Sequence, residues 1–352
     1  MSRFLSQKRK NLVPYVPGEQ PKDKKYIKLN TNESPFPPSE KALAYAAKAA
    51  ESLNLYSDPE CTPIVNKLSA LYGVADDEIL FTNGSDEILN FAFMAFCDES
   101  VVFPDITYGF YKVFADINNV PYEEIPLKSD FTIDINDYIG INKNIFIANP
   151  NAPTGILLPC GDIEKIIKSN PDNIVVIDEA YIDFGGESCI PLTKKYDNLL
   201  VTGTFSKSRS LAGARLGFGI ASKALISDLN SIKYSTNPYN INSMTMAAGL
   251  GVLEDEEYTR DNCKKIIQTR EYTKSELKKL GFRFTDSKAN FVFAEHQRIS
   301  GEEIYEKLRA DGILVRHFKG SRTGNYNRIT IGTDEQMNTL LAKLKKITSK
   351  EN

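Results

Sequence analysis

Two residues of this chain, Lys207 and Asp178, each follow a run of apolar residues, an arrangement that could support chemistry. Lys207 comes soon after "NLLVTGTF", and Asp178 directly follows "NIVVI". A lysine at the floor of a cleft loses its proton more easily and can attack a carbonyl carbon. A buried carboxylate is costly unless a cation is paired with it. Taken alone, each residue also has an ordinary explanation: a solvated loop lysine and a structural ion pair.

Further residues along the chain could bind the anionic or polar groups of a ligand. The run "EILFT" leads into "NGSDE", where Ser85 and Asp86 open a helix whose free N–H groups and dipole attract an anion. The ordinary alternative there is a helix N-cap. The run "NIFIA" ends in the rigid turn "NPNAPTG", which presents the amides of Asn149 and Asn151. Arg215, in "LAGARLGF", would add a fixed positive charge for a phosphate.

Two arginines near the end of the chain, Arg316 and Arg328, lie in the runs "ILVRHF" and "NRITIG". One arginine at a strand end is usually part of a surface ion pair. Two of them near successive strand ends could together hold an anionic substrate.

Other kinds of catalytic centre find little support in the sequence. His296 and His317 are the only histidines, and no cysteine or carboxylate has metal-ligand spacing around them. We therefore expect neither a metal centre nor a Ser–His–Asp hydrolase. The five cysteines include no CxxC pair, which favours reduced thiols in the cytoplasm over a disulfide framework or a zinc site.

The composition indicates a soluble globular protein. The chain has 352 residues, of which 41% are hydrophobic and 25% charged, enough for a large core and two domains. A net charge of −3 gives no reason to expect nucleic acid as a partner. No apolar run approaches the roughly 20 residues that a membrane span needs, and the start lacks the apolar core of a signal peptide.

Apolar runs that alternate with amphipathic segments predict how these residues are positioned. We expect strands at 78–82, 100–104, 144–150, 173–180 and 198–205, with helices such as 86–96 and 160–169 between them. Strands that are apolar on both faces indicate a mostly parallel sheet covered on both sides. Ligands bind such sheets at the carboxyl ends of the strands, where the candidate residues lie.

The end of the chain changes character and predicts a second, smaller domain. A helical stretch over roughly 240–280 precedes a strand–helix–strand–strand pattern and a final helix at 334–349. The N-terminal segment is rich in Pro and Asn and lacks a core of its own, so we expect it to pack onto this smaller domain. The predicted division is a large domain at 46–255 and a small domain made of 1–45 and 256–352.

One cofactor, pyridoxal phosphate, would use these residues together. It needs a lysine that bonds to it, a carboxylate for its ring nitrogen, donors to its phenolic oxygen and an anion site for its phosphate. The residues that would meet these needs are Lys207, Asp178, Tyr181 with an asparagine, and the "GSDE" helix start with Ser206 and Arg215.

With these motifs the chain resembles the fold-type I pyridoxal-phosphate aminotransferases, most closely the histidinol-phosphate branch. The resemblance covers nearly the whole chain and includes "LNTNESPFPP", "YSDPE", "NGSDEIL", "ITYGFY", "NPNAPTG", "VVIDEAYIDF", "TFSKSRSLAGARLGF" and "NRITIGT", in the family's order. It implies an α/β fold, with a mostly parallel central sheet flanked by helices in the large domain and a smaller α+β domain. It also implies a homodimer with shared active sites.

The resemblance implies a role for each matching residue. Lys207 would bond to the cofactor and, once freed, move the proton between the substrate's Cα and the cofactor's C4′. Asp178 would keep the ring nitrogen protonated, Tyr181 would bond the phenolic oxygen and Tyr108 would stack on the ring. The residues implied to hold the phosphate are Ser85, Asp86, Thr204, Ser206 and Arg215, and those implied to face the substrate are Tyr15, Asn32, Arg316 and Arg328.

Tyr56 is implied to act in the neighbouring subunit, and Ala152 departs from the family's pattern. Tyr56 would reach the cofactor phosphate of the neighbouring subunit. The residue before "PTG" is usually the asparagine that bonds the phenolic oxygen, but here it is Ala152. We expect the adjacent Asn151 to serve instead, with a shifted turn.

The resemblance implies a reversible, ping-pong transamination in histidine biosynthesis. L-Glutamate would leave as 2-oxoglutarate, and imidazole-acetol phosphate would become L-histidinol phosphate. The alternatives in the same fold are an aromatic or broad-specificity aminotransferase and a threonine-phosphate decarboxylase, which the cofactor motifs do not separate. An alternative from a different class is a binding or regulatory protein that has kept the pocket. We see no attached DNA-binding segment in the sequence, and every expected catalytic residue is present. Both observations speak against this last alternative.

Overall fold

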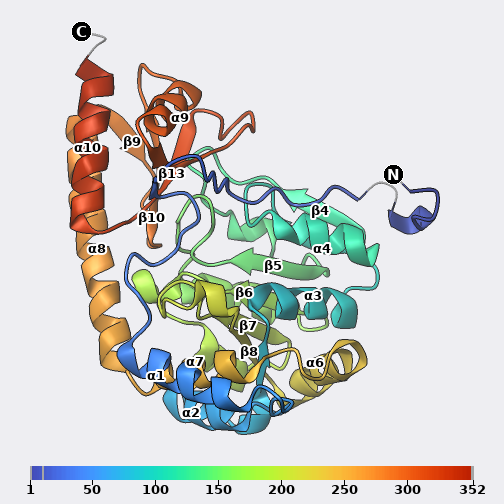
Figure 1. Cartoon of the computed structure of the whole chain (residues 1–352). Coiled ribbons are helices and arrows are strands. Elements are labelled where there is room, and N and C mark those ends of the chain that lie inside the picture. The colour runs from blue at the N-terminus through green and yellow to red at the C-terminus, as the bar shows by residue number, and fades with distance from the viewer. Residues whose placement is uncertain (1, 10–11, 350–352) are drawn as a thin grey trace.

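A seven-stranded sheet forms the centre of the computed structural model, which describes residues 2–9 and 12–349 (Figure 1). Every neighbouring pair in this sheet is parallel except the two pairs that β8 makes, with β2 and with β7. The mostly parallel sheet predicted from the sequence is therefore confirmed. Across the sheet the strands are β2 (Ile79–Thr82), β8 (Gly217–Ala221), β7 (Leu199–Thr204), β6 (Val175–Asp178), β5 (Asn144–Ala148), β3 (Val101–Pro104) and β4 (Tyr122–Ile125).

The five strands expected from the sequence are present, and two strands of the sheet were not anticipated. β4 carries the polar run "YEEI" at the sheet edge, so it lacks the apolar signal of a buried strand. β8 contains two glycines, which are uncommon in strands. Position 217 has room only for a glycine, because a Cβ there would lie 2.3 Å from the backbone nitrogen of Ser85.

Alternate residues of the central strands pack against helices on opposite faces of the sheet. Ile145 and Ile147 of β5 join one apolar core, whereas Phe146 between them joins the other. Burying such a side chain stabilises the fold by about 1.5–3 kcal/mol. The helices of the first face are α2 (Thr62–Tyr72), α5 (Cys160–Ser169) and α7 (Ser243–Leu253), and those of the second are α3 (Ser85–Phe96), α4 (Phe110–Asn118) and α6 (Lys223–Thr236).

A four-stranded antiparallel sheet organises the last part of the chain. Its strands, in order, are β12 (Arg316–His317), β13 (Tyr326–Thr330), β10 (Phe291–His296) and β9 (Phe282–Phe284). Helices α8 (Glu256–Lys279), α9 (Gly301–Ala310) and α10 (Asp334–Ser349) pack with this sheet in a third core. In Figure 1 the long helix α8 runs from the helices below the large sheet up to the small sheet. The helical stretch expected near 240–280 is thus two helices, α7 and α8, separated at Glu254 and Asp255.

The N-terminal segment contacts both parts of the molecule. β1 (Ile27–Lys28) pairs in parallel with β11 (Ile313–Leu314), next to the small sheet. Helix α1 (Glu40–Ala49) instead packs along α7, and it crosses the predicted boundary between 45 and 46. The division into 46–255 and the remaining residues stays a prediction, and residues 1, 10–11 and 350–352 of the predicted small domain lie outside the described residues.

Short 3-10 helices complete the described elements: Gln7–Arg9, Ala50–Ser52, Asp76–Glu78, Ile135–Asp137, Ile182–Phe184, Ile190–Lys194 and Ala212–Ala214. None of the described helices combines the length and apolar character that crossing a bilayer requires.

Candidate active site

A cavity of about 260 Å³ lies at the carboxyl ends of the central strands and is lined by many of the predicted residues. The strand register explains why these residues lie close together, because Ala148 of β5, Asp178 of β6 and Thr202 of β7 are neighbours in adjacent strands. The turns that follow these strands therefore open at the same edge of the sheet. The predicted residues that line the cavity are Ser85, Asp86, Tyr108, Asp178, Tyr181, Thr204, Ser206, Lys207 and Arg215.

Lys207 lies in the turn after β7 with its amine facing the cavity wall. Its Nζ donates a hydrogen bond to the backbone oxygen of Thr31 at 3.3 Å and lies 5.7 Å from the centre of the Tyr181 ring. The partner is a neutral carbonyl rather than a carboxylate. Within the described part of the chain, the amine thus has no fixed counter-charge that would have to be displaced before it reacts.

Asp178 ends β6 as a buried carboxylate that makes only hydrogen bonds. One oxygen accepts from Tyr111 Oη at 3.3 Å, and the other accepts from the nitrogen of Ala180 at 3.2 Å and Thr202 Oγ1 at 3.5 Å. Burial raises the pKa of Asp178 to about 6, and the three hydrogen bonds oppose that rise. No arginine or lysine pairs with this carboxylate among the described residues. A buried, unpaired carboxylate at a cavity wall fits a ligand that carries a positive charge, such as a protonated ring nitrogen.

Tyr111 is a residue that the sequence analysis missed. It is fully buried on α4, three residues after Tyr108, which lies just before this helix, and the two rings meet edge to face at 5.7 Å. The i, i+3 spacing of the two tyrosines in "YGFY" could have predicted that both point toward the sheet. The segment that leads into α4 therefore supplies a lining tyrosine, and the helix itself supplies the hydrogen bond to Asp178.

The start of α3 forms an anion cradle together with the turn after β7. Gly84 precedes the helix at φ +78°, and no side chain caps the first N–H groups. Arg215 Nη2 lies 3.0 Å from Asp86 Oδ2, and Thr204 Oγ1 donates to Ser206 Oγ at 3.0 Å. Uncapped N–H groups, two hydroxyls and a guanidinium form the donor set that a phosphate needs. These residues therefore fit the phosphate of the expected cofactor.

Asn151 is not in the lining of this cavity, and its bond to the phenolic oxygen stays a prediction. Its amide donates to the oxygen of Ile106 and to Thr154 Oγ1, and its own oxygen accepts from Thr107 Oγ1. Asn151 lines a separate apolar cavity, whereas Ala152 lines the site. The side chain of Asn151 is thus bonded to Ile106, Thr107 and Thr154 in this structure.

Tyr181 and Asn32 are joined directly, although they are far apart in the sequence. Asn32 Nδ2 donates to Tyr181 Oη at 2.9 Å, and Asn32 Oδ1 accepts from Thr330 Oγ1 at 3.0 Å. Tyr181 also packs edge to face against Phe291 at 5.2 Å. The small sheet and the N-terminal segment therefore fix the phenol at the cavity wall.

Arg316 and Arg328 lie directly opposite each other in the β12–β13 ladder. Arg328 is partly buried and lies over the ring of Phe291, and desolvation lowers the pKa of its guanidinium. Its Nη2 donates to the oxygen of Asn30 at 3.1 Å, while Arg316 donates to the oxygens of Val16 and Pro17. Neither arginine pairs with a carboxylate among the described residues. Two like charges placed opposite each other destabilise a sheet unless an anion lies between them.

Six predicted residues are not in the lining of this cavity: Asn151, Asn32, Arg316 and Arg328, described above, and also Tyr15 and Tyr56. Tyr15 is partly exposed and packs against Phe110, with ring centres 4.3 Å apart. Tyr56 is 83% exposed and stacks on Tyr239 at 4.5 Å. The structure of one chain thus leaves Tyr56 outside its own site.

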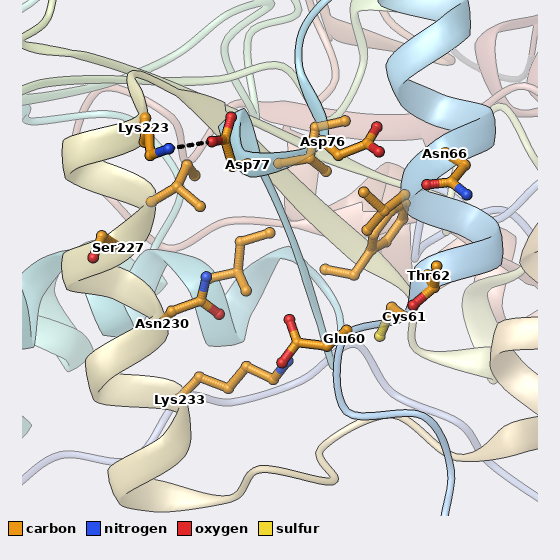
Figure 2. Close-up of a pocket in the computed structure, with 15 residues that line it drawn as sticks. Glu60, Cys61, Thr62, Asn66, Asp76, Asp77, Lys223, Ser227, Asn230 and Lys233 are labelled. Atoms are coloured by element: carbon orange, nitrogen blue, oxygen red, sulfur yellow. Dashed lines mark ion pairs between the residues drawn. The ribbon is translucent and has the colours of Figure 1, made fainter.

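A second cavity, of about 450 Å³, contains none of the predicted residues (Figure 2). It lies between α2 and α6 and is lined by residues such as Glu60 and Asn230. Lys223 and Asp77 form an ion pair across it at 2.7 Å, and the buried Lys233 donates to the oxygen of Pro59. The two lysines of the lining are thus already partnered, so we assign no chemistry to this cavity.

Comparisons with known proteins agree with the geometry of the site. The family model described as aminotransferase class I and II matches residues 24–344. A histidinol-phosphate aminotransferase of Brachyspira hyodysenteriae is 53% identical over 355 residues, which is 99% of each chain. One of Clostridium acetobutylicum is 48% identical over 348 residues, covering 98% of this chain and 99% of that protein.

A solved structure of a histidinol-phosphate aminotransferase, from Sinorhizobium meliloti in complex with pyridoxal-5′-phosphate, has a similar fold. It aligns with a TM-score of 0.90 at 22% identity and covers 100% of this chain and 99% of that one. At this identity the likeness concerns the fold, and it agrees with the fold-type I architecture described above.

Proposed function

This chain belongs to the aminotransferase class I and II family, and we propose that it is a histidinol-phosphate aminotransferase. It would transfer an amino group reversibly between L-glutamate and imidazole-acetol phosphate, giving 2-oxoglutarate and L-histidinol phosphate in histidine biosynthesis. The observation that carries the choice of substrate is the facing pair Arg316 and Arg328, which lack a carboxylate partner in the described chain. An anionic substrate group would neutralise this pair.

The cofactor is pyridoxal phosphate, which when bound acts as an electron sink for the bonds at the substrate's α-carbon. Lys207 Nζ would bond to it and, once free, take the proton from that carbon. The carboxylate of Asp178 would hold the proton on the ring nitrogen. The phenol of Tyr181, oriented by Asn32, would donate to the phenolic oxygen. Because Ala152 offers no amide, Asn151 would be the second donor to this oxygen, and it would have to leave its present partners.

The remaining cavity residues would bind and orient. The N–H groups at Ser85 and Asp86 would hold the phosphate together with Thr204, Ser206 and Arg215. Asp86 accepts from Tyr108 Oη at 2.6 Å, which fixes the tyrosine proposed to stack on the ring.

One substrate site must accept both a phosphate and the second carboxylate of glutamate. Arg316 and Arg328 offer several donors to either group, because guanidinium forks bind carboxylates and phosphates alike. Tyr15 and Asn32 would complete the wall that faces the substrate. The carbonyls of Val16 and Pro17, which now accept from Arg316, would give way to the anion.

We propose that the enzyme works as a homodimer in which Tyr56 completes the partner's phosphate site. Support comes from the exposed apolar side chains of Leu43, Leu53 and Leu55, which lie near Tyr56 in the sequence. An apolar cavity of about 390 Å³ adjoins Leu43 at α1 and α7. The cytoplasmic location expected from the unpaired cysteines remains a prediction.

Mixed dimers test the shared site. Lys207→Ala chains and Tyr56→Ala chains are each expected to be impaired alone. A dimer of one chain of each kind has one site with both Lys207 and the partner's Tyr56 intact, so mixing should restore activity. No recovery in a demonstrated mixed dimer would contradict the sharing, as would a monomer in light scattering.

A substrate panel tests the reaction itself. L-Histidinol phosphate and 2-oxoglutarate should react with a kcat/KM far above that for phenylpyruvate or other aromatic acceptors. A preference for phenylpyruvate would support the broad-specificity alternative, and release of carbon dioxide from threonine phosphate would support the decarboxylase. A chain that binds the cofactor but turns over none of these substrates would point to the binding or regulatory alternative.

A further inference from the structure

Two cysteines outside the site lie in contact. Cys160 is the first residue of α5, and Cys189 directly precedes the 3-10 helix Ile190–Lys194. Their Sγ atoms are 3.2 Å apart, and Cys160 Sγ also donates to the oxygen of Glu187 at 3.1 Å. A disulfide bond measures about 2.05 Å, so bonding needs an approach of only about 1 Å. The Cys160 sulfur is thus held by the segment that carries Cys189.

We propose that Cys160 and Cys189 form a reversible disulfide by exchange with a low-molecular-weight disulfide such as glutathione disulfide. Cys160 is the partly exposed member of the pair, and Cys189 is buried. The Cys160 sulfur would attack the small disulfide, which releases one thiol and leaves a mixed disulfide on Cys160. The Cys189 sulfur would then attack Cys160 Sγ and release the second thiol. The two protein thiols are oxidised, the small disulfide is reduced to two thiols, and the thiol protons end on the released molecules.

A buried carboxylate, Glu179, is placed to assist the second step. Its carboxylate accepts from the backbone nitrogen of Cys189 at 2.6 Å and from Ser188 Oγ, so it is fixed next to Cys189. Burial raises the pKa of Glu179 to about 7, which suits a group that takes up and returns a proton near neutral pH. Burial also raises the pKa of Cys189, so this thiol needs a base before it can attack. Glu179 would accept that proton and pass it to the leaving thiolate.

The cross-link would join two parts of the chain that flank β6. Asp178 at the end of this strand directly precedes Glu179, and neither cysteine lines the site cavity. The proposal therefore concerns a modification site next to the active site and does not depend on the reaction assigned to that site.

Thiol counting on the full-length, cofactor-loaded protein tests the proposal. After incubation with glutathione disulfide, two of the five cysteines should become unreactive in denaturant, and the mass should fall by two hydrogen atoms. A peptide map should show the fragments of Cys160 and Cys189 joined, and dithiothreitol should restore all thiols. Five persisting thiols, a stable glutathione adduct on Cys160 without closure, or a link between two chains would each overturn the proposal.

Three variants sharpen the result. Cys160→Ser should retain all its remaining thiols, whereas Cys263→Ser, which removes a buried cysteine on α8, should still lose two. Glu179→Gln should slow closure several-fold while the first glutathione adduct forms at its usual rate. An unchanged closure rate would remove Glu179 from the proposal. If Cys160→Ser does not fold, the peptide map of the unmodified chain decides the question.

Discussion

The residues at the carboxyl edge of the large sheet are held mostly by one another, whereas the arginines of the small sheet are held by backbone carbonyls. At the first place, Asp86 accepts from both Tyr108 and Arg215. At the second, Arg316 donates to Val16 and Pro17 of the N-terminal segment. Arg328 Nε, nearby, is buried without a hydrogen-bond partner in the described chain.

The contrast separates two tasks. A region whose charges are mostly satisfied internally keeps its shape before a ligand arrives, as a permanently held cofactor requires. A region with two uncompensated cations gains most when an anion binds. Substitutions at the large-sheet edge should therefore lower turnover equally for both substrate pairs. Substitutions of the two arginines should instead weaken the binding of each substrate according to the charged groups that this substrate carries.

The largest expected effect comes from Lys207→Ala, which removes the amine that bonds to the cofactor. Turnover should fall below detection for both half-reactions, and the absorbance band of the covalently bound cofactor should disappear. The matched control is Lys223→Ala, which removes an exposed lysine paired with Asp77 and should keep near-normal activity. Residual turnover of Lys207→Ala with either substrate would contradict the mechanism.

Asp178→Asn should lower kcat by about 10²–10³-fold with both substrate pairs, because it removes the charge that holds the proton on the ring nitrogen. Steady-state kinetics at saturating cofactor measure this loss. A selective loss for one substrate only would contradict the separation of tasks.

The same variant should have the opposite effect on the cofactor-free fold. The pKa of about 6 in the folded chain lies above the ordinary value of 3.8, so burial favours the protonated carboxyl. The contribution of this carboxyl group to the free energy of unfolding is fully present below about pH 4 and is lost as the pH rises through 6. Asp178→Asn removes that loss, so above pH 7 the cofactor-free variant should be more stable by up to about 3 kcal/mol. Urea unfolding at pH 5 and pH 8 measures the difference, and Glu179→Gln separates the similar titration of its neighbour.

The sequence predicted the large-sheet edge better than the small-sheet region, for a physical reason. Asp178 and Lys207 each follow strands that are apolar on both faces, so local pattern and sheet topology together place them. Asn151 stays a prediction, because neighbouring side chains in a turn point in different directions and only the turn geometry decides which of them reaches a ligand. Contacts such as Asn32 with Tyr181 join distant segments, and no local pattern announces them. Tyr56 stays a prediction, because it concerns a second chain.

Arg328→Lys and Arg316→Lys should weaken substrate binding while leaving the cofactor in place. A hydrogen bond to a charged group contributes about 1.5–3 kcal/mol, so kcat/KM for L-histidinol phosphate should fall about 10- to 100-fold. The spectrum of the bound cofactor should not change. Arg322→Lys is the control, because Arg322 already pairs with Asp105 at 3.1 Å and should affect binding little. A lost cofactor spectrum in Arg328→Lys would show that the two regions are not separate.

The smallest expected effect, from Tyr111→Phe, tests the large-sheet edge most finely. The change removes the hydroxyl 3.3 Å from Asp178 but keeps the ring packed against Phe103 and Phe146. Loss of one long hydrogen bond to a buried carboxylate should lower kcat/KM by about 3- to 10-fold, equally for both substrate pairs.

Because the hydroxyl lowers the pKa of Asp178, its removal should shift the acidic limb of the pH profile upward. Tyr138→Phe is a matched control, since Tyr138 Oη is buried and has no hydrogen-bond partner in the described chain. That variant should leave both the rate and the pH profile unchanged. If both variants gave the same small loss without a pH shift, Tyr111 would act through packing alone. Asp178 would then depend for its orientation on Ala180 and Thr202, and α4 would contribute no hydrogen bond to it.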